Sequence, residues 1–180
     1  HDSTVFVSVG ALIERKRPDL IVSSFLKAQL QSHSILVFVG TGPMAQTCKD
    51  LARGQKNIIF AGQSESVSQY LACSDVFISA ATSEGLPNTV LEAMASGIFC
   101  VLSSIEPHKE IGDVDPLTCF YFTPDNMNEL TEVIEKSTRI DLKERAARCR
   151  LLAEKNFSSR RMSIDYQNLY SSIHNASRSK

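Results

Sequence analysis

Short apolar runs alternate along the chain with segments whose apolar residues recur at helical spacing. The first run, Val5–Val9, is rich in β-branched and aromatic residues and ends at Gly10. After Pro18, apolar residues at positions 20, 21, 25 and 28 share one face of a helix. Because this succession of strand, loop and amphipathic helix recurs toward the C-terminus, the pattern predicts repeated strand–helix units.

The same criteria locate the other elements. We predict further strands at Ile35–Val39, Asn57–Phe60, Asp75–Ser79, Ile98–Leu102 and Phe120–Phe122. Helices are expected after Pro43, over Val67–Ala72, from Pro87 to Gly97, over Asn126–Lys136 with Asp125 as N-cap, and over Leu142–Lys155 and Ser159–Ile173. Strands that are nearly all apolar are buried on both faces, which indicates a parallel sheet. The predicted fold class is therefore α/β, a doubly wound, Rossmann-like parallel sheet of about six strands flanked by helices.

A length of 180 residues suits one domain. We expect residues 5–156 to form the α/β core and residues 157–180 to form a C-terminal helix with a frayed tail. This helix carries a stripe of apolar residues that needs a partner, and dimerisation through the stripe is one outcome: Met162, Ile164, Leu169 and Ile173.

The composition of the chain excludes several classes of protein. Nineteen basic and 20 acidic side chains give a formal net charge of −1, so no overall field favours nucleic acid or an anionic membrane. No apolar run approaches the ~20 residues that span a bilayer, and no secretory signal is visible, so a cytoplasmic protein is expected. The five cysteines are widely spaced without a C-x-x-C pair, which predicts reduced, mostly buried thiols rather than disulfides or a zinc site.

In a doubly wound sheet, ligands bind beyond the carboxyl ends of the strands, where the strand order reverses. Among the loops at that edge, the segment from Ser83 to Glu92 carries the strongest chemical signal. A glycine-containing loop precedes a helix there, so the N–H groups of residues 85, 86, 88 and 89 are expected to face an anion such as a phosphate. We expect this largely apolar helix to bury Glu92, whose carboxylate would then need donors, either a basic side chain such as Lys16 or a ribose diol.

These residues carry a resemblance to a known family. Glu84 and Glu92 are separated by seven residues, and the run SEGLPNTVLEAMASGIFCVLS resembles the E-x7-E motif of retaining, GT-B-type glycosyltransferases of the large family 4. Three other segments occur in the family's order: Val7–Gly10 followed by Lys16, Val39–Pro43 before a helix, and Ser74–Ser79 before the acidic loop. The chain is similar to the C-terminal, donor-binding domain of such an enzyme over residues 5–112.

The resemblance implies roles for these residues. It puts Glu84 beside the hydroxyls of the transferred sugar, Glu92 on the ribose, and Lys16 on the diphosphate. We therefore predict catalytic roles for Glu84 and Lys16, and donor-binding roles for Gly10, Arg17, Gly62, Gln63, Gly85, Leu86, Pro87, Asn88, Thr89 and Glu92. No metal and no cofactor is implied; the substrate is a nucleotide-sugar, with UDP-sugar favoured over GDP-sugar.

The sequence departs from the family pattern in two places. Ala11 stands where the family usually has an arginine on the diphosphate, and Arg17 stands where a glycine often follows the lysine. Either Arg15 or Arg17 compensates, or the donor site has lost affinity; Arg15 taken alone is explained more simply as part of a solvated basic loop. The loop over residues 103–110 lacks the family's paired glycines, and we expect His108 within it to be exposed and inert.

Weaker signals suggest other kinds of site. Asp113-Val-Asp115 spells D-x-D, but no strand end precedes it, and we expect a polar turn without metal. Gly40-Thr-Gly42 lacks the third glycine of a dinucleotide-binding loop. Gly62-Gln63 either flanks the nucleotide base or forms an ordinary turn.

The resulting hypothesis is a donor-binding domain that serves transfer of a sugar with retention and without metal. A glycan or lipid-linked acceptor, as in polysaccharide biosynthesis, would bind an N-terminal domain absent from this sequence, so the domain alone is expected to bind nucleotide without transfer. The full-length enzyme would associate peripherally with the inner face of a membrane. Two alternatives stay open, a GT-B-fold sugar-nucleotide epimerase and a non-catalytic nucleotide-binding module.

Overall fold

One parallel sheet of six strands forms the centre of the protein. A computed structural model describes residues 3–30 and 34–178. The strands are β1 (Val5–Val9), β2 (Ile35–Val39), β3 (Ile58–Gly62), β4 (Val76–Ser79), β5 (Phe99–Ser103) and β6 (Cys119–Phe122). Every pairing is parallel and the order is β3-β2-β1-β4-β5-β6. The predicted doubly wound α/β fold is thereby confirmed.

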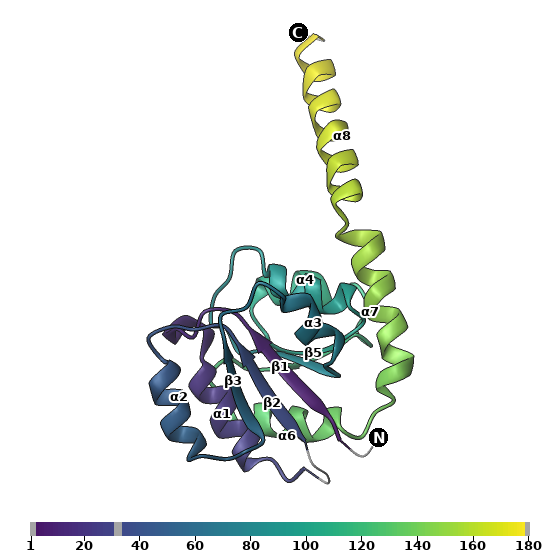
Figure 1. The fold of residues 1–180 in the computed structure, drawn as a ribbon. Coiled ribbons are helices and arrows are strands. Elements are labelled where there is room, and N and C mark those ends of the chain that lie inside the picture. The colour runs from purple at the N-terminus through teal and green to yellow at the C-terminus, as the bar shows by residue number, and fades with distance from the viewer. Residues whose placement is uncertain (1–2, 31–33, 179–180) are drawn as a thin grey trace.

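Helices cover both faces of the sheet (Figure 1). One face packs against α1 (Pro18–Lys27), α2 (Ala45–Ala52) and α6 (Met127–Ser137). The other packs against α3 (Val67–Ala72), α4 (Asn88–Ala95), α5 (Glu106–Gly112) and α7 (Leu142–Asn156). Neighbouring strand residues point to opposite cores: Phe6 is buried on the first face and Val7 on the second. This two-sided burial explains why the strands are continuous apolar runs rather than alternating ones.

Two local predictions are wrong. The N-cap of α6 is Asn126 rather than Asp125, because the Asn126 side chain accepts hydrogen bonds from the N–H groups of Asn128 and Glu129. Asp125 has a φ of 64° and instead pairs with Arg17. Residues 103–110 were expected to form a loop, yet α5 begins at Glu106, where an acid and Pro107 in the first turn favour a helix start.

The last helix, α8 (Ser159–Arg178), projects away from the sheet domain (Figure 1). It continues beyond the predicted end at Ile173, and the final two residues of the tail predicted to fray lie outside the described residues. Its predicted apolar stripe is exposed at Met162, Ile164, Leu169 and Ile173. In the part of the chain that the structure describes, no helix has the length and apolar character to cross a membrane.

All five cysteines are free thiols, as predicted. Four are buried and Cys73 is exposed. Burial raises the pKa of the Cys48 thiol to about 11 and that of the Cys149 thiol to about 12, so both stay protonated. These buried thiols therefore behave as small apolar side chains of the core.

Candidate functional site

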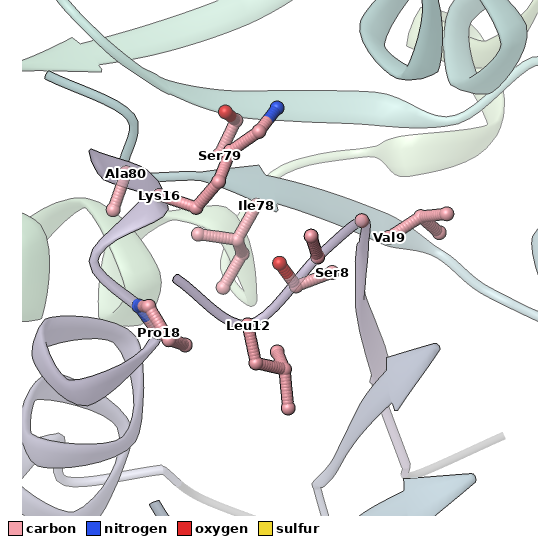
Figure 2. Close-up of a pocket in the computed structure, with 10 residues that line it drawn as sticks. Ser8, Val9, Leu12, Lys16, Pro18, Ile78, Ser79 and Ala80 are labelled. Carbon is pink, nitrogen blue, oxygen red and sulfur yellow. The ribbon is translucent and has the colours of Figure 1, made fainter. Parts of the chain in front are cut away.

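The strand order reverses between β1 and β4, and a small cavity lies at their carboxyl ends (Figure 2). Gly10, Ala11 and Lys16 line it from the loop after β1, and Ser79 and Ala80 line it from the end of β4. In doubly wound sheets this switch point is the usual place for ligands. The loops that begin at Gly10 and Ala80 therefore meet at this cavity.

Two glycines bring the ends of β1 and β2 close together. A Cβ at Gly40 would lie 2.0 Å from the carbonyl oxygen of Gly10, so no side chain fits there. Gly10 has a φ of 142°, which favours glycine. The chain then forms a short 3₁₀ helix, η1 (Glu14–Lys16), and Lys16 folds back so that a Cβ at Gly10 would lie 4.0 Å from Nζ of Lys16. The lysine ammonium group thus lies over the end of β1.

Glu84 joins two cations at this site. Nζ of Lys16 donates to Oε1 of Glu84, and a guanidinium nitrogen of Arg15 lies 3.0 Å from Oε2. The carbonyl oxygen of Arg15 accepts from the N–H of Thr82 at 2.9 Å. Because the side chain of Glu84 is only 9% exposed, these contacts hold the loop between β4 and α4 firmly against η1.

The electrostatics of Glu84 follow from this environment. Burial alone would raise the pKa of its carboxyl group, but hydrogen bonds and charge from Lys16 and Arg15 outweigh burial and lower the pKa below its usual 4.5. Glu84 is therefore ionised at neutral pH. Of the two arginines that could compensate for Ala11, Arg15 lies at the site.

Arg17 faces a different neighbourhood. Its guanidinium group pairs with Asp19 at 3.2 Å and with Asp125, which lies just before the N-cap of α6. Its φ of 49° is the left-handed conformation that glycine adopts most readily, which agrees with the glycine that the resemblance places at this position. The structure does not bring Arg17 to Lys16 and Glu84.

The expectation that Glu92 is buried is wrong. The buried face of α4 consists of Val90, Ala93 and Met94. Glu92 points the other way, to the exposed face of the helix. Within the described residues its carboxylate has no hydrogen bond or ion pair, so the predicted alternative of a Lys16–Glu92 pair does not occur. Glu92 is accessible to a ligand.

The start of α4 offers some, but not all, of the predicted N–H groups. The N–H of Asn88 donates to the carbonyl oxygen of Leu86 at 2.9 Å, and those of Val90 and Leu91 donate to the buried Pro87. In the described part of the chain, the N–H groups of Gly85, Leu86 and Thr89 have no backbone acceptor outside helices and strands. These three remain available to an anion.

A second cavity of about 340 Å³ adjoins the first at Gly10 and Ala11. It extends over the ends of β2 and β3, where Thr41, Gln63 and Ser64 line it. Gly62, which ends β3, accepts from the N–H of Gly40 at 2.7 Å. The predicted base-flanking segment thus lies beside the loop after β1, with Ala11 at the junction of the two cavities.

Comparison with known proteins identifies the family. The family described as "Glycosyl transferases group 1" matches residues 3–138, more than half of the chain. The chain belongs to this family. A curated relative, the Escherichia coli UDP-Gal:alpha-D-GlcNAc-diphosphoundecaprenol alpha-1,3-galactosyltransferase, is 30% identical over 113 residues, which are 58% of this chain and 29% of the relative. The chain spans between 22% and 29% of the length of the curated relatives that it matches.

Solved glycosyltransferases share the fold. A glycosyltransferase from Rickettsia africae superposes with a TM-score of 0.84 at 20% identity, over 96% of this chain and 48% of the other. HepE of Anabaena, in complex with UDP and glucose, gives a TM-score of 0.81 at 18% identity, over 95% of this chain and 49% of the other. At these identities the likeness shows the fold alone, which is that of one GT-B half.

Within this member of the group 1 family, the prediction that His108 is exposed is wrong. The imidazole is fully buried on the inner face of α5 and lies between Ser79 and Ser103. The sequence pattern did not predict that Ser79, Ser103 and His108 lie together. The helix-start residues Glu106 and Pro107 were the available signal, because a helix from there puts positions 108 and 111 on one face.

The D-x-D segment forms the polar turn that was expected. Asp115 accepts from the N–H of Leu117 at 3.0 Å and pairs with Arg148 at 3.1 Å. Across residues 3–30 and 34–178, no group of three or more histidine, cysteine or acidic side chains is arranged to hold a metal ion.

Proposed function

We propose that this chain is the donor-binding domain of a retaining, metal-independent glycosyltransferase that uses a nucleotide-sugar, with UDP favoured over GDP. The observation that carries the proposal is the meeting of Lys16 and Glu84 at the switch point of the sheet. The relative from Escherichia coli is named for UDP-Gal, and HepE of Anabaena was solved with UDP and glucose. Both names support a uridine nucleotide.

The chemistry follows from where charge develops. Cleavage of the bond between sugar and nucleotide leaves negative charge on the diphosphate. The Lys16 ammonium group and the N–H groups of Gly85 and Leu86 would stabilise this charge more in the transition state than in the ground state. Glu84 would accept hydrogen bonds from sugar hydroxyls, and the exposed Glu92 would accept from the ribose diol. The cavity at Gln63 would take the base.

The acceptor requires a part that lies outside this sequence. A glycan or lipid-linked acceptor would bind an N-terminal domain, and the transfer site would be the cleft between the two halves. The exposed stripe of α8 would pack against that half, or against a second copy of the chain. We propose a cytoplasmic enzyme at the inner face of a membrane, acting in polysaccharide biosynthesis.

Isothermal titration calorimetry of the domain with UDP, GDP and their glucose and mannose esters tests the proposal. We expect saturable binding that is tighter for UDP than for GDP. Lys16→Ala should weaken UDP binding by roughly tenfold, because a charge-assisted contact to the diphosphate is lost. Lys49→Ala, at an exposed position on α2, is the matched control.

Absence of binding to every nucleotide would contradict the proposal and favour a decayed, non-catalytic module. Conversion of a UDP-sugar by the full-length protein without any acceptor would favour the epimerase.

A further inference from the structure

Three polar side chains form a buried network beneath the switch point. Ser79 ends β4, Ser103 ends β5, and His108 lies on α5. His108 and Ser103 are fully buried, and Ser79 is 9% exposed. Burying an imidazole and two hydroxyl groups is costly unless each is hydrogen-bonded, so the arrangement of their donors and acceptors is informative.

The contacts determine which imidazole nitrogen carries the proton. Nδ1 of His108 lies 2.8 Å from the carbonyl oxygen of Ser103, which only accepts, so Nδ1 must donate. The hydroxyl of Ser103 donates to the carbonyl oxygen of Ala81. In neutral His108, Nε2 is therefore an acceptor, and its partner at 3.4 Å is the hydroxyl of Ser79.

His108 is held in this neutral form. Burial lowers the pKa of its imidazole; the hydrogen bond to Ser103 and the charge of Glu84 act in the opposite direction, and Lys16 lowers the pKa further. The hydroxyl of Tyr121 on β6 also lies against α5 and donates to the carbonyl oxygen of His108. A neutral imidazole leaves Nε2 free to accept.

This arrangement has a consequence for Ser79. When the hydroxyl of Ser79 donates its proton to His108, the lone pairs of the oxygen point away from His108 and can accept other hydrogen bonds. Ser79 lines the switch-point cavity together with Lys16 (Figure 2). Lys16 has three N–H donors, of which Glu84 takes one.

We propose that His108 is a positioning residue of the donor site: by accepting the hydroxyl proton of Ser79, it leaves Oγ of Ser79 as an acceptor in the cavity that Lys16 also lines, where the ammonium group has N–H donors to spare. Ser79 would then be a second acceptor for the ammonium group, beside Glu84. The inference rests on the proposed function for its use of Lys16, and its geometry is testable without nucleotide.

The first test is ¹⁵N NMR of histidine in the wild-type domain, which needs no variant. We expect His108 to be neutral at pH 7.5, with Nδ1 protonated and Nε2 unprotonated. The opposite tautomer, or a charged imidazole, would overturn the proposal.

Two substitutions separate the contacts of the imidazole. The amide of His108→Asn reaches the position of Nδ1 and retains the donor to Ser103, whereas the amide of His108→Gln reaches the position of Nε2 and retains the acceptor for Ser79. In ¹³C-lysine spectra without nucleotide, the Lys16 Cε signal should move in His108→Asn and in Ser79→Ala and stay near its wild-type position in His108→Gln. An unmoved Lys16 signal in the first two variants would refute the positioning role.

UDP calorimetry on the same variants completes the test. His108→Asn and Ser79→Ala should each weaken binding by roughly fivefold, the double variant by no more than either, and His108→Gln by less than about twofold. Multiplying losses in the double variant would mean that the two residues act independently. If wild type fails to bind UDP while the two NMR results hold, the proposed function fails and the positioning of Lys16 stands.

Discussion

Glu84 and Glu92 belong to one motif but have opposite environments. Glu84 is nearly buried and shared by Lys16 and Arg15, whereas Glu92 is exposed and has no partner within the described residues. The first is fixed in place before any ligand arrives, and the second is available to one. This contrast assigns them different tasks.

Glutamine substitutions separate the two tasks. In the full-length enzyme, Glu84→Gln should lower kcat by roughly 100-fold or more with little change in nucleotide affinity, because the proposed function puts the lost charge beside the reacting sugar. Glu92→Gln should weaken UDP binding by roughly fivefold with a smaller effect on kcat. Steady-state kinetics and calorimetry measure both, with exposed Glu132→Gln on α6 as the control. Full activity in both variants would rule out these roles.

Ala11 stands where the family pattern has an arginine. It is exposed and lines both cavities, so an arginine there would reach the diphosphate without repacking the core. Ala11→Arg should tighten UDP binding by roughly fivefold to tenfold, and the gain should shrink at high salt. Ala147→Arg on α7 is the matched control. Unchanged affinity would indicate that Arg15 already supplies the second cation.

At the scale of elements, α6 depends on the residue that caps its N-terminus. Asn126 caps two N–H groups of the helix, while Asp125 makes only a surface ion pair with Arg17. Asn126→Ala should therefore lower the free energy of unfolding by about 1 kcal/mol, and Asp125→Ala by less than about 0.5 kcal/mol. Urea denaturation measures both values. Equal losses would contradict this assignment of the cap.

The strands and long helices were predictable from sequence because each carries its own signal. Continuous apolar runs such as Val5–Val9 and Ile35–Val39 fit a sheet that is buried on both faces. The short helix α5 has only His108, Ile111 and Gly112 buried, which is too little periodicity to detect. The Lys16–Glu84 contact joins residues 68 apart, so no local pattern reveals it. The family motif selected the residues, and folding decided which of them meet.

At the scale of the whole molecule, α8 stands apart from the sheet domain (Figure 1). Its first half shares a cavity of about 350 Å³ with Leu86 and Leu91 of the α4 region, and its apolar stripe is otherwise open. The helix therefore contributes little to the stability of the isolated domain. Its apolar surface fits a role in joining this domain to another body.

Truncation after Ser158 tests this. The shortened domain should keep a melting temperature within about 3 °C of the full chain, because few buried contacts are lost. Self-association at high concentration should fall, since the exposed stripe is removed. Differential scanning calorimetry and analytical ultracentrifugation measure the two effects. A collapse of the melting transition would show that α8 is part of the cooperative unit.

The tight approach of Gly40 to Gly10 has an effect beyond the backbone. Residue 40 lies one strand away from Lys16, yet any side chain there would push against the Gly10 carbonyl and shift the turn that carries the lysine. The position of the Lys16 ammonium group thus depends on Gly40, a residue that carries no charge. Tolerance to substitution at this edge of the sheet is set by backbone proximity as much as by contact with a ligand.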